Sequence, residues 1–111
     1  MTPYELSWLA GLLEGEGSFD TQSRASEKRH DRPRIQFGST DFDICERVAQ
    51  LFNKKVNGPY KAYKNQKAIK PYCRVLISGP RAADLMKLLY PLLGKRRKLQ
   101  IRTALMRWKV L

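Results

Sequence analysis

Two carboxylates stand at the end of an apolar segment, where helix electrostatics disfavours them. The run Leu6–Leu13 is followed by residues 14–17, which read Glu-Gly-Glu-Gly. A helix over this run would end at the glycines, and the helix macrodipole opposes anions at that end by about 0.3 to 1 kcal/mol. A Mg²⁺ ion prefers carboxylate oxygens and reverses the sign of that effect. The pair therefore indicates either a divalent-metal site or two solvated glutamates beside a helix end.

The helix that carries these acids is predicted to begin at Thr2, with Pro3 in its first turn and Glu5 closing a capping box. It is predicted to run to about Leu13, and it is apolar on two faces, so both faces need cover. A chain of this size can cover one face, and we expect a second copy to cover the other. Small residues four apart would let two backbones approach closely. The predicted dimer contact comprises Trp8, Gly11, Leu12 and Gly15. Two Glu16 side chains would then meet near the dimer axis.

Charge gives the strongest compositional signal. The formal net charge is +12, and no acidic residue lies between Glu46 and Asp84 or after Asp84. Such a surface favours a polyanionic partner, most often nucleic acid. The alternatives are a solvated basic surface and an anionic membrane surface.

The 111 residues predict a single domain over 1–111, and a hydrophobic fraction of 42% is enough for a core. We expect no membrane span and no secretory signal, and therefore an intracellular location in the cytoplasm, the nucleoid or an organelle. Cys45 and Cys73 stand among apolar neighbours and are predicted to be core residues. The single histidine, His30, cannot furnish a histidine-rich metal site. No glycine-rich phosphate loop is present, so no nucleotide cofactor is expected.

The remaining segments alternate between strand and helix patterns. Strands are predicted at 18–26, 34–38, 56–64 (interrupted at Gly58-Pro59) and 72–78. Helices are predicted at 41–53 with Ser39 or Thr40 as cap, from Gly79-Pro80 to near Pro91, and from about Lys95. The order is helix, strand, strand, helix, strand, strand, helix, helix. It predicts an α+β fold in which one four-stranded antiparallel sheet is backed by helices on a single face.

The other face of that sheet would be wide, polar and basic, which suits a duplex groove. Arginine and glutamine can contact base edges in pairs of hydrogen bonds, while lysine more often meets phosphates. The candidates to face DNA are Asp20, Gln22, Arg24, Arg34, Gln36, Lys61, Tyr63, Arg74 and Leu76. The sequence does not determine which residues after Gly58-Pro59 point to the outer face of the sheet. Lys61 and Tyr63 are therefore the weakest of these candidates.

Residues 9–17, Leu-Ala-Gly-Leu-Leu-Glu-Gly-Glu-Gly, resemble the signature of the LAGLIDADG homing endonucleases, with Glu at both places where the family name has Asp. The resemblance extends to Ser39-Thr40-Asp41, to the segment Ala83–Met86 and to Tyr90–Arg97, and it covers essentially the whole chain. One motif copy in a chain of this size resembles the homodimeric members of the family. Members that act as single chains carry two copies.

This resemblance implies a sequence-specific double-strand DNA endonuclease, encoded in an intron, an intein or a free-standing mobile element. It implies cleavage of a near-palindromic site across the minor groove. Mg²⁺ would be the cofactor, Mn²⁺ a substitute, and Ca²⁺ a support for binding without cleavage.

The resemblance also assigns residue roles. Glu16 and the Gly15 carbonyl would hold the metal, and Glu14 would be more structural. Arg96 matches the active-site cation best, with Lys95, Arg97 and Lys98 as alternatives. Ser39 stands where the family often has Gln or Asn, so positioning of water falls to Ser39 or Gln36. Their simpler roles would be a helix cap and a base contact.

Two other functions fit the same fold. One is an RNA maturase that assists intron splicing without cutting DNA. The other is a non-catalytic DNA-binding regulator, in which the acids are usually lost. The presence of both Glu14 and Glu16 argues against the regulator and leaves the maturase open.

Overall fold

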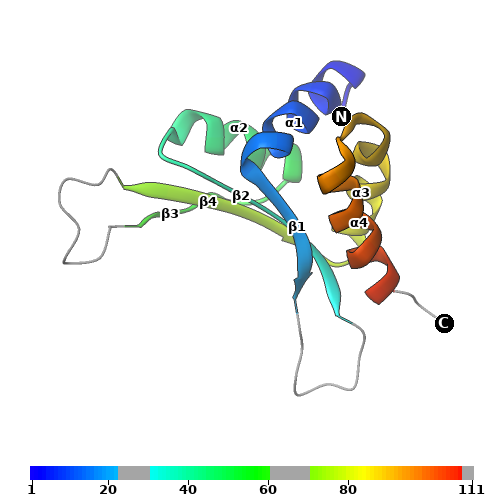
Figure 1. Ribbon diagram of the computed structural model, residues 1–111. Helices are drawn as coiled ribbons and strands as arrows, with labels where there is room; N and C mark the ends of the chain where they lie inside the picture. Colours follow the sequence, from blue (N-terminus) through cyan, green and yellow to red (C-terminus); the bar gives the residue numbers. More distant parts are fainter. Residues whose placement is uncertain (23–30, 61–70, 109–111) are drawn as a thin grey trace.

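A computed structural model describes residues 1–22, 31–60 and 71–108. The strands form one antiparallel sheet in the order β1-β2-β4-β3, and the helices lie on one side of it (Figure 1). This arrangement confirms the predicted α+β fold. The elements are α1 (Pro3–Glu16), β1 (Gly17–Gln22), β2 (Arg32–Ser39), α2 (Phe42–Phe52), β3 (Asn57–Tyr60), β4 (Tyr72–Ser78), α3 (Pro80–Leu89), a short 3-10 helix η1 (Tyr90–Leu92) and α4 (Lys95–Arg107).

Strict alternation in the central strands creates the two faces of the sheet. Ile35 and Phe37 of β2 and Val75 and Ile77 of β4 are buried under the helices, while the residues between them point to the other side and are less buried. Alternate residues of a strand point to opposite faces, so this pattern fixes the inner and outer faces as predicted. Both cysteines are buried and free, as expected.

Helix α1 begins as predicted but ends later. Thr2 Oγ1 accepts a hydrogen bond from the Glu5 N–H at 3.1 Å, and the Glu5 carboxylate accepts one from the Thr2 N–H at 2.8 Å. The prediction that the helix ends near Leu13 is wrong, because it continues through Glu16. Gly17 then leads directly into β1. A Cβ on Gly17 would lie 2.5 Å from Leu13 Cδ2, so glycine permits this abrupt change from helix to strand.

The start of α2 also differs from prediction. Its N-cap is Asp41, not Ser39 or Thr40, because Ser39 still belongs to β2. The Ser39 hydroxyl accepts the Asp41 N–H at 3.0 Å and so stabilises the turn between strand and helix. β2 begins at Arg32, two residues earlier than predicted. The predicted strand residues 23–26 and 61–64 lie outside the described residues.

The predicted interruption at Gly58-Pro59 is confirmed. This peptide bond is cis, and the register between β3 and β4 shifts between Asn57 and Tyr60. In the described parts of the chain, no helix combines the length and the apolar character that crossing a bilayer requires.

Candidate nucleic-acid interface and metal site

Glu16 is the last residue of α1, and its side chain is exposed. Among the described residues it takes part in no hydrogen bond or ion pair. Gly15 beside it is also exposed. The β1–β2 register places Ser18, two residues after Glu16, opposite Gln36. Glu16 therefore lies where α1 joins the sheet, and its carboxylate is available to a ligand.

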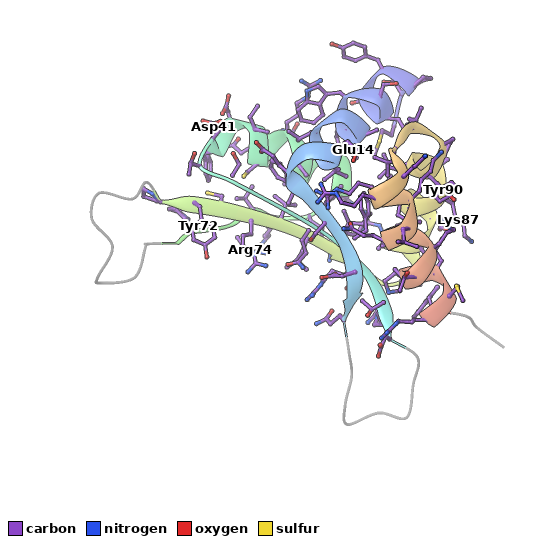
Figure 2. All side chains as sticks on the ribbon, in the orientation of Figure 1. Glu14, Asp41, Tyr72, Arg74, Lys87 and Tyr90 are labelled. Atoms are coloured by element: carbon purple, nitrogen blue, oxygen red, sulfur yellow. The ribbon has the colours of Figure 1, made fainter. Side chains whose placement is uncertain are left out.

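Glu14 has a different environment, although it stands only two residues away. Its carboxylate accepts the backbone N–H of Gly94, the N-cap of α4. Arg97 Nε donates to the Glu14 carbonyl at 3.1 Å and lies 3.9 Å from Glu14 Oε2. Figure 2 shows Glu14 between the end of α1 and the helices of the C-terminal half. A carboxylate is favourable at a helix N-terminus, so Glu14 links α1 to α4.

The cations of the first turn of α4 fall into two groups. Arg97 is buried, with 6% of its surface exposed, and also donates to Gln100 at 3.1 Å. Burial lowers the Arg97 pKa, and the nearby Arg96 charge adds to this effect. Lys98 Nζ lies over the Tyr90 ring, 5.4 Å from its centroid. Lys95 and Arg96 are exposed. Of the four candidate cations, these two therefore remain available to a ligand.

The sheet face opposite the helices carries the described members of the predicted DNA face. Asp20 lies opposite Arg34, and Gln36 lies opposite Leu76. Arg74 points away from the helices together with Tyr72 (Figure 2). The remaining described candidate, Gln22, is exposed at the end of β1. Arg24, Lys61 and Tyr63 lie outside the described residues.

Sequence reasoning missed Arg32 on this face. Arg32 lies opposite Gln22, and its guanidinium packs where a side chain on Gly79 would clash. Gly79 has a φ of 82°, a conformation that glycine adopts without strain. The alternation of residues 32–35, Arg-Pro-Arg-Ile, is the signal in the sequence that extends this strand to Arg32.

The second face of α1 is open along part of its length. Gly11 and Gly15 are exposed, and a Cβ built on either glycine meets nothing within 4 Å apart from its chain neighbours and the backbone of its own helix. Trp8 and Leu12 are half-buried and pack against the core. The Arg47 guanidinium lies 4.0 Å from the centroid of the Trp8 ring, a cation–π contact that the sequence did not predict. The glycines thus form the open centre of the predicted dimer contact.

Comparisons with known proteins identify the fold. No protein-family model and no curated protein matches the sequence. Many solved structures are similar to this chain, and three of them show the extent of the likeness. The homing endonuclease I-CvuI, in complex with its target and calcium, has a TM-score of 0.65 at 15% identity, over 94% of this chain and 66% of that one. I-TnaI has a TM-score of 0.60 at 12% identity, over 91% and 69%. The LAGLIDADG meganuclease I-CpaMI has a TM-score of 0.62 at 16% identity, and the match covers 91% of this chain and 37% of that one.

The chain therefore has the fold of the LAGLIDADG homing endonucleases, which is the family that the motif at residues 9–17 resembles. It spans slightly less than two thirds of the length of I-CvuI. At these identities the likeness concerns the fold.

The donor set at the end of α1 fits Mg²⁺ only as part of a larger site. The described residues contain no cluster of three or more acidic, cysteine or histidine side chains that could hold a metal. Mg²⁺ is commonly bound by one or two carboxylates together with water and substrate phosphates. Glu16 and the Gly15 carbonyl fit this pattern if phosphates, or a second copy of the chain, complete the shell.

The structural role of Glu14 predicts the effect of Glu14→Gln. The amide keeps an oxygen for the Gly94 N–H but removes the charge opposite Arg97. Because the Glu14 side chain is 40% exposed, we expect a loss of about 1 to 2 kcal/mol in unfolding free energy. Urea unfolding in EDTA and in Mg²⁺ measures it, with the exposed Glu46→Gln as control. A loss seen only with Mg²⁺ would place Glu14 in the metal site instead.

Proposed function

We propose that this protein is a Mg²⁺-dependent DNA endonuclease that acts as a homodimer on a near-palindromic duplex site. The observation that carries the proposal is the position of Glu16, an exposed carboxylate where the open face of α1 meets the polar face of the sheet. Such a place lets one acid approach both a partner copy and a duplex. Since duplex DNA is the substrate, we also propose an intracellular location.

The proposal of duplex DNA as substrate rests on charge and on relatives. The net charge of +12 provides a strong attraction to phosphates. Three of the proteins with this fold were solved on DNA: I-CvuI on its target, I-CeuI with DNA and I-CpaMI on uncleaved DNA. The uncovered face of the sheet presents arginine and glutamine side chains that suit base edges and phosphates.

The proposed roles follow from exposure. Glu16 and the Gly15 carbonyl would hold Mg²⁺, which when bound activates water and neutralises the leaving oxygen. Arg96, or its exposed neighbour Lys95, would stabilise charge on the scissile phosphate. Gln36 or Ser39 would position water, since the amide of Gln36 and the hydroxyl of Ser39 each keep a hydrogen-bonding site beyond the partners they contact. A two-fold dimer supplies these groups twice, which matches a near-palindromic site.

Selection of cleaved sequences from randomised duplexes tests this function. With Mg²⁺ we expect double-strand cuts within one near-palindromic family of sequences. With Ca²⁺ we expect binding to the same sequences without cuts, and with EDTA no cuts. Specific duplex binding that never leads to cutting would favour a DNA-binding regulator. Preference for a structured intron RNA over duplex DNA would favour an RNA maturase.

Salt should weaken duplex binding steeply, because binding releases counterions from DNA. A protein that neutralises six to ten phosphates loses about 10³- to 10⁵-fold in affinity between 50 and 200 mM salt. Fluorescence anisotropy in Ca²⁺ gives the slope. Arg74→Gln, on the sheet face, should weaken binding more than Lys87→Gln, which removes the same charge from an exposed site on α3 (Figure 2). Equal effects of the two variants would contradict the assigned DNA face.

A further inference from the structure

A chain of hydrogen bonds crosses three strands on the uncovered face of the sheet. Arg34 donates from Nε to Asp20 Oδ1 at 2.9 Å and from Nη2 to Asp20 Oδ2 at 3.0 Å. Gln36 Nε2 donates to the same Oδ2 at 3.0 Å. Arg74 Nη2 donates to Gln36 Oε1 and so extends the chain to β4. We call these four residues the Asp20 network.

Asp20 is the only acidic residue in the four described strands. On a face that meets DNA an acid repels phosphates, so its presence needs a compensating role. An ion pair whose side chains are 27% (Arg34) and 41% (Asp20) exposed is still screened by water and contributes only about 0 to 1 kcal/mol to stability, which is a weak reason for placing an acid there. Asp20 instead receives three N–H donors from two side chains. Its carboxylate therefore fixes the directions of its neighbours.

The ion pair with Asp20 leaves three N–H donors of the Arg34 guanidinium available to a ligand. A guanidinium has five N–H donors in a planar fork, and Asp20 takes the pair formed by Nε and one Nη2 hydrogen. The donors that remain are the two on Nη1 and the second on Nη2, which lie on the other edges of the same plane. Two parallel donors of this kind match O6 and N7 of guanine in the major groove. The hydrogen bond with Asp20 also raises the Arg34 pKa.

Gln36 has a single favourable orientation in this network. Its amide N–H₂ faces the Asp20 carboxylate, and its carbonyl oxygen faces the Arg74 guanidinium. Turning the amide over would set oxygen against carboxylate and N–H₂ against guanidinium, and both contacts are repulsive. A free glutamine can rotate to accept or to donate. Gln36 is held, so it transmits the position of Asp20 to Arg74.

We propose that Asp20 is a specificity-determining positioning residue that presets Arg34 to read a guanine in each half-site, with Gln36 aligning Arg74 in the same unit. This inference rests on the proposed function, since it requires a duplex on the sheet face. Its consequence is unusual, because binding strength and base preference should change in opposite directions. Asp20→Asn removes an acid, which favours DNA in general, and weakens the bidentate pairing that orients Arg34.

Binding-site selection from randomised duplexes in Ca²⁺ tests the proposal. Asp84→Asn makes the same charge change at an exposed site on α3 and serves as the matched control. For Asp20→Asn we expect equal or higher affinity for random duplexes, and a loss of about tenfold or more in the preference for guanine at one position of each half-site. Arg34→Lys keeps the positive charge but lacks the two parallel N–H donors of the guanidinium. It should therefore lose the preference for guanine at the same position. Asp84→Asn should retain every preference.

The outcomes separate the inference from the proposed function. Unchanged base preferences in Asp20→Asn and Arg34→Lys, with duplex binding retained, would overturn the readout alone. Absence of any sequence-dependent duplex binding by the unmodified protein would overturn both. Urea unfolding shows whether Asp20→Asn still folds. If it does not fold, Arg34→Lys decides the outcome, since a retained guanine preference in that variant overturns the readout.

Discussion

Glu16→Gln should abolish Mg²⁺-dependent cutting, while duplex binding in Ca²⁺ holds or rises. Glutamine keeps the size of the side chain and removes the charge that holds a divalent cation. It also removes an anion from a surface that meets phosphates, so affinity should not fall. Loss of one preorganised electrostatic group commonly costs about 10²- to 10³-fold in rate, and loss of the metal should cost at least that much.

The measurement compares duplex binding in Ca²⁺ with nicking in Mg²⁺ on the selected site. Glu46→Gln removes the same charge from an exposed site on α2 and should cut normally. Arg96→Ala and Lys95→Ala should be milder than Glu16→Gln, and the slower of the two identifies the active-site cation. Robust Mg²⁺-dependent cutting by Glu16→Gln would refute the metal assignment.

If the proposed dimer forms through α1, Gly15→Leu should convert it to a monomer that is at least as stable within each chain. A Cβ at Gly15 meets nothing within 4 Å apart from its chain neighbours and the backbone of α1, so leucine has room in the isolated protomer. Leucine also favours a helix over glycine by up to about 1 kcal/mol. If two α1 helices approach closely at their glycines, the same side chain forces the backbones apart. Each protomer then keeps its fold, and the two copies of Glu16 no longer meet.

Sedimentation equilibrium gives the mass of the variant, and urea unfolding gives the stability of its chains. Gln50→Leu adds a leucine to an exposed position of α2 and should leave the dimer intact. Double-strand cutting should fall together with dimerisation in Gly15→Leu. A variant that sediments as the same dimer as the unmodified protein would show that the interface lies elsewhere.

Interactions and patterns among residues close in sequence were sufficient to predict most of the helices and strands. The capping box at Thr2 and Glu5 involves residues three apart, so the sequence alone contains both partners. The alternation of Cys73, Val75 and Ile77 with more exposed residues fixed the faces of β4 for the same reason. The ends of elements were less predictable. α1 passes beyond Leu13 because its last turn is continuous with β1, and strand pairing decides that boundary.

Side-chain partnerships across the fold were not predictable. Asp20 and Arg34 are both polar residues on one face, but their pairing depends on the register of β1 against β2. Arg97 and Arg96 are neighbours of the same residue type. Only the tertiary fold, in which Arg97 reaches the Glu14 carbonyl at the end of α1, buries Arg97 and leaves Arg96 exposed. A sequence shows which residues share a face and leaves open which of them touch.

Glu14 and Glu16 show most clearly what the sequence determines and what depends on the tertiary structure. The sequence by itself determined that residues 14 and 16 are both carboxylates at the end of a helix, and that a metal would relieve their position. Two residues along a helix turn the side chain by about 200°, so the two must face nearly opposite ways. The resemblance assigned the metal to Glu16, but only the tertiary structure shows the contacts that set the two acids apart. The N-terminus of α4 packs on the side of Glu14 and binds its carboxylate through Gly94, and Glu16 is left facing outward with its charge available.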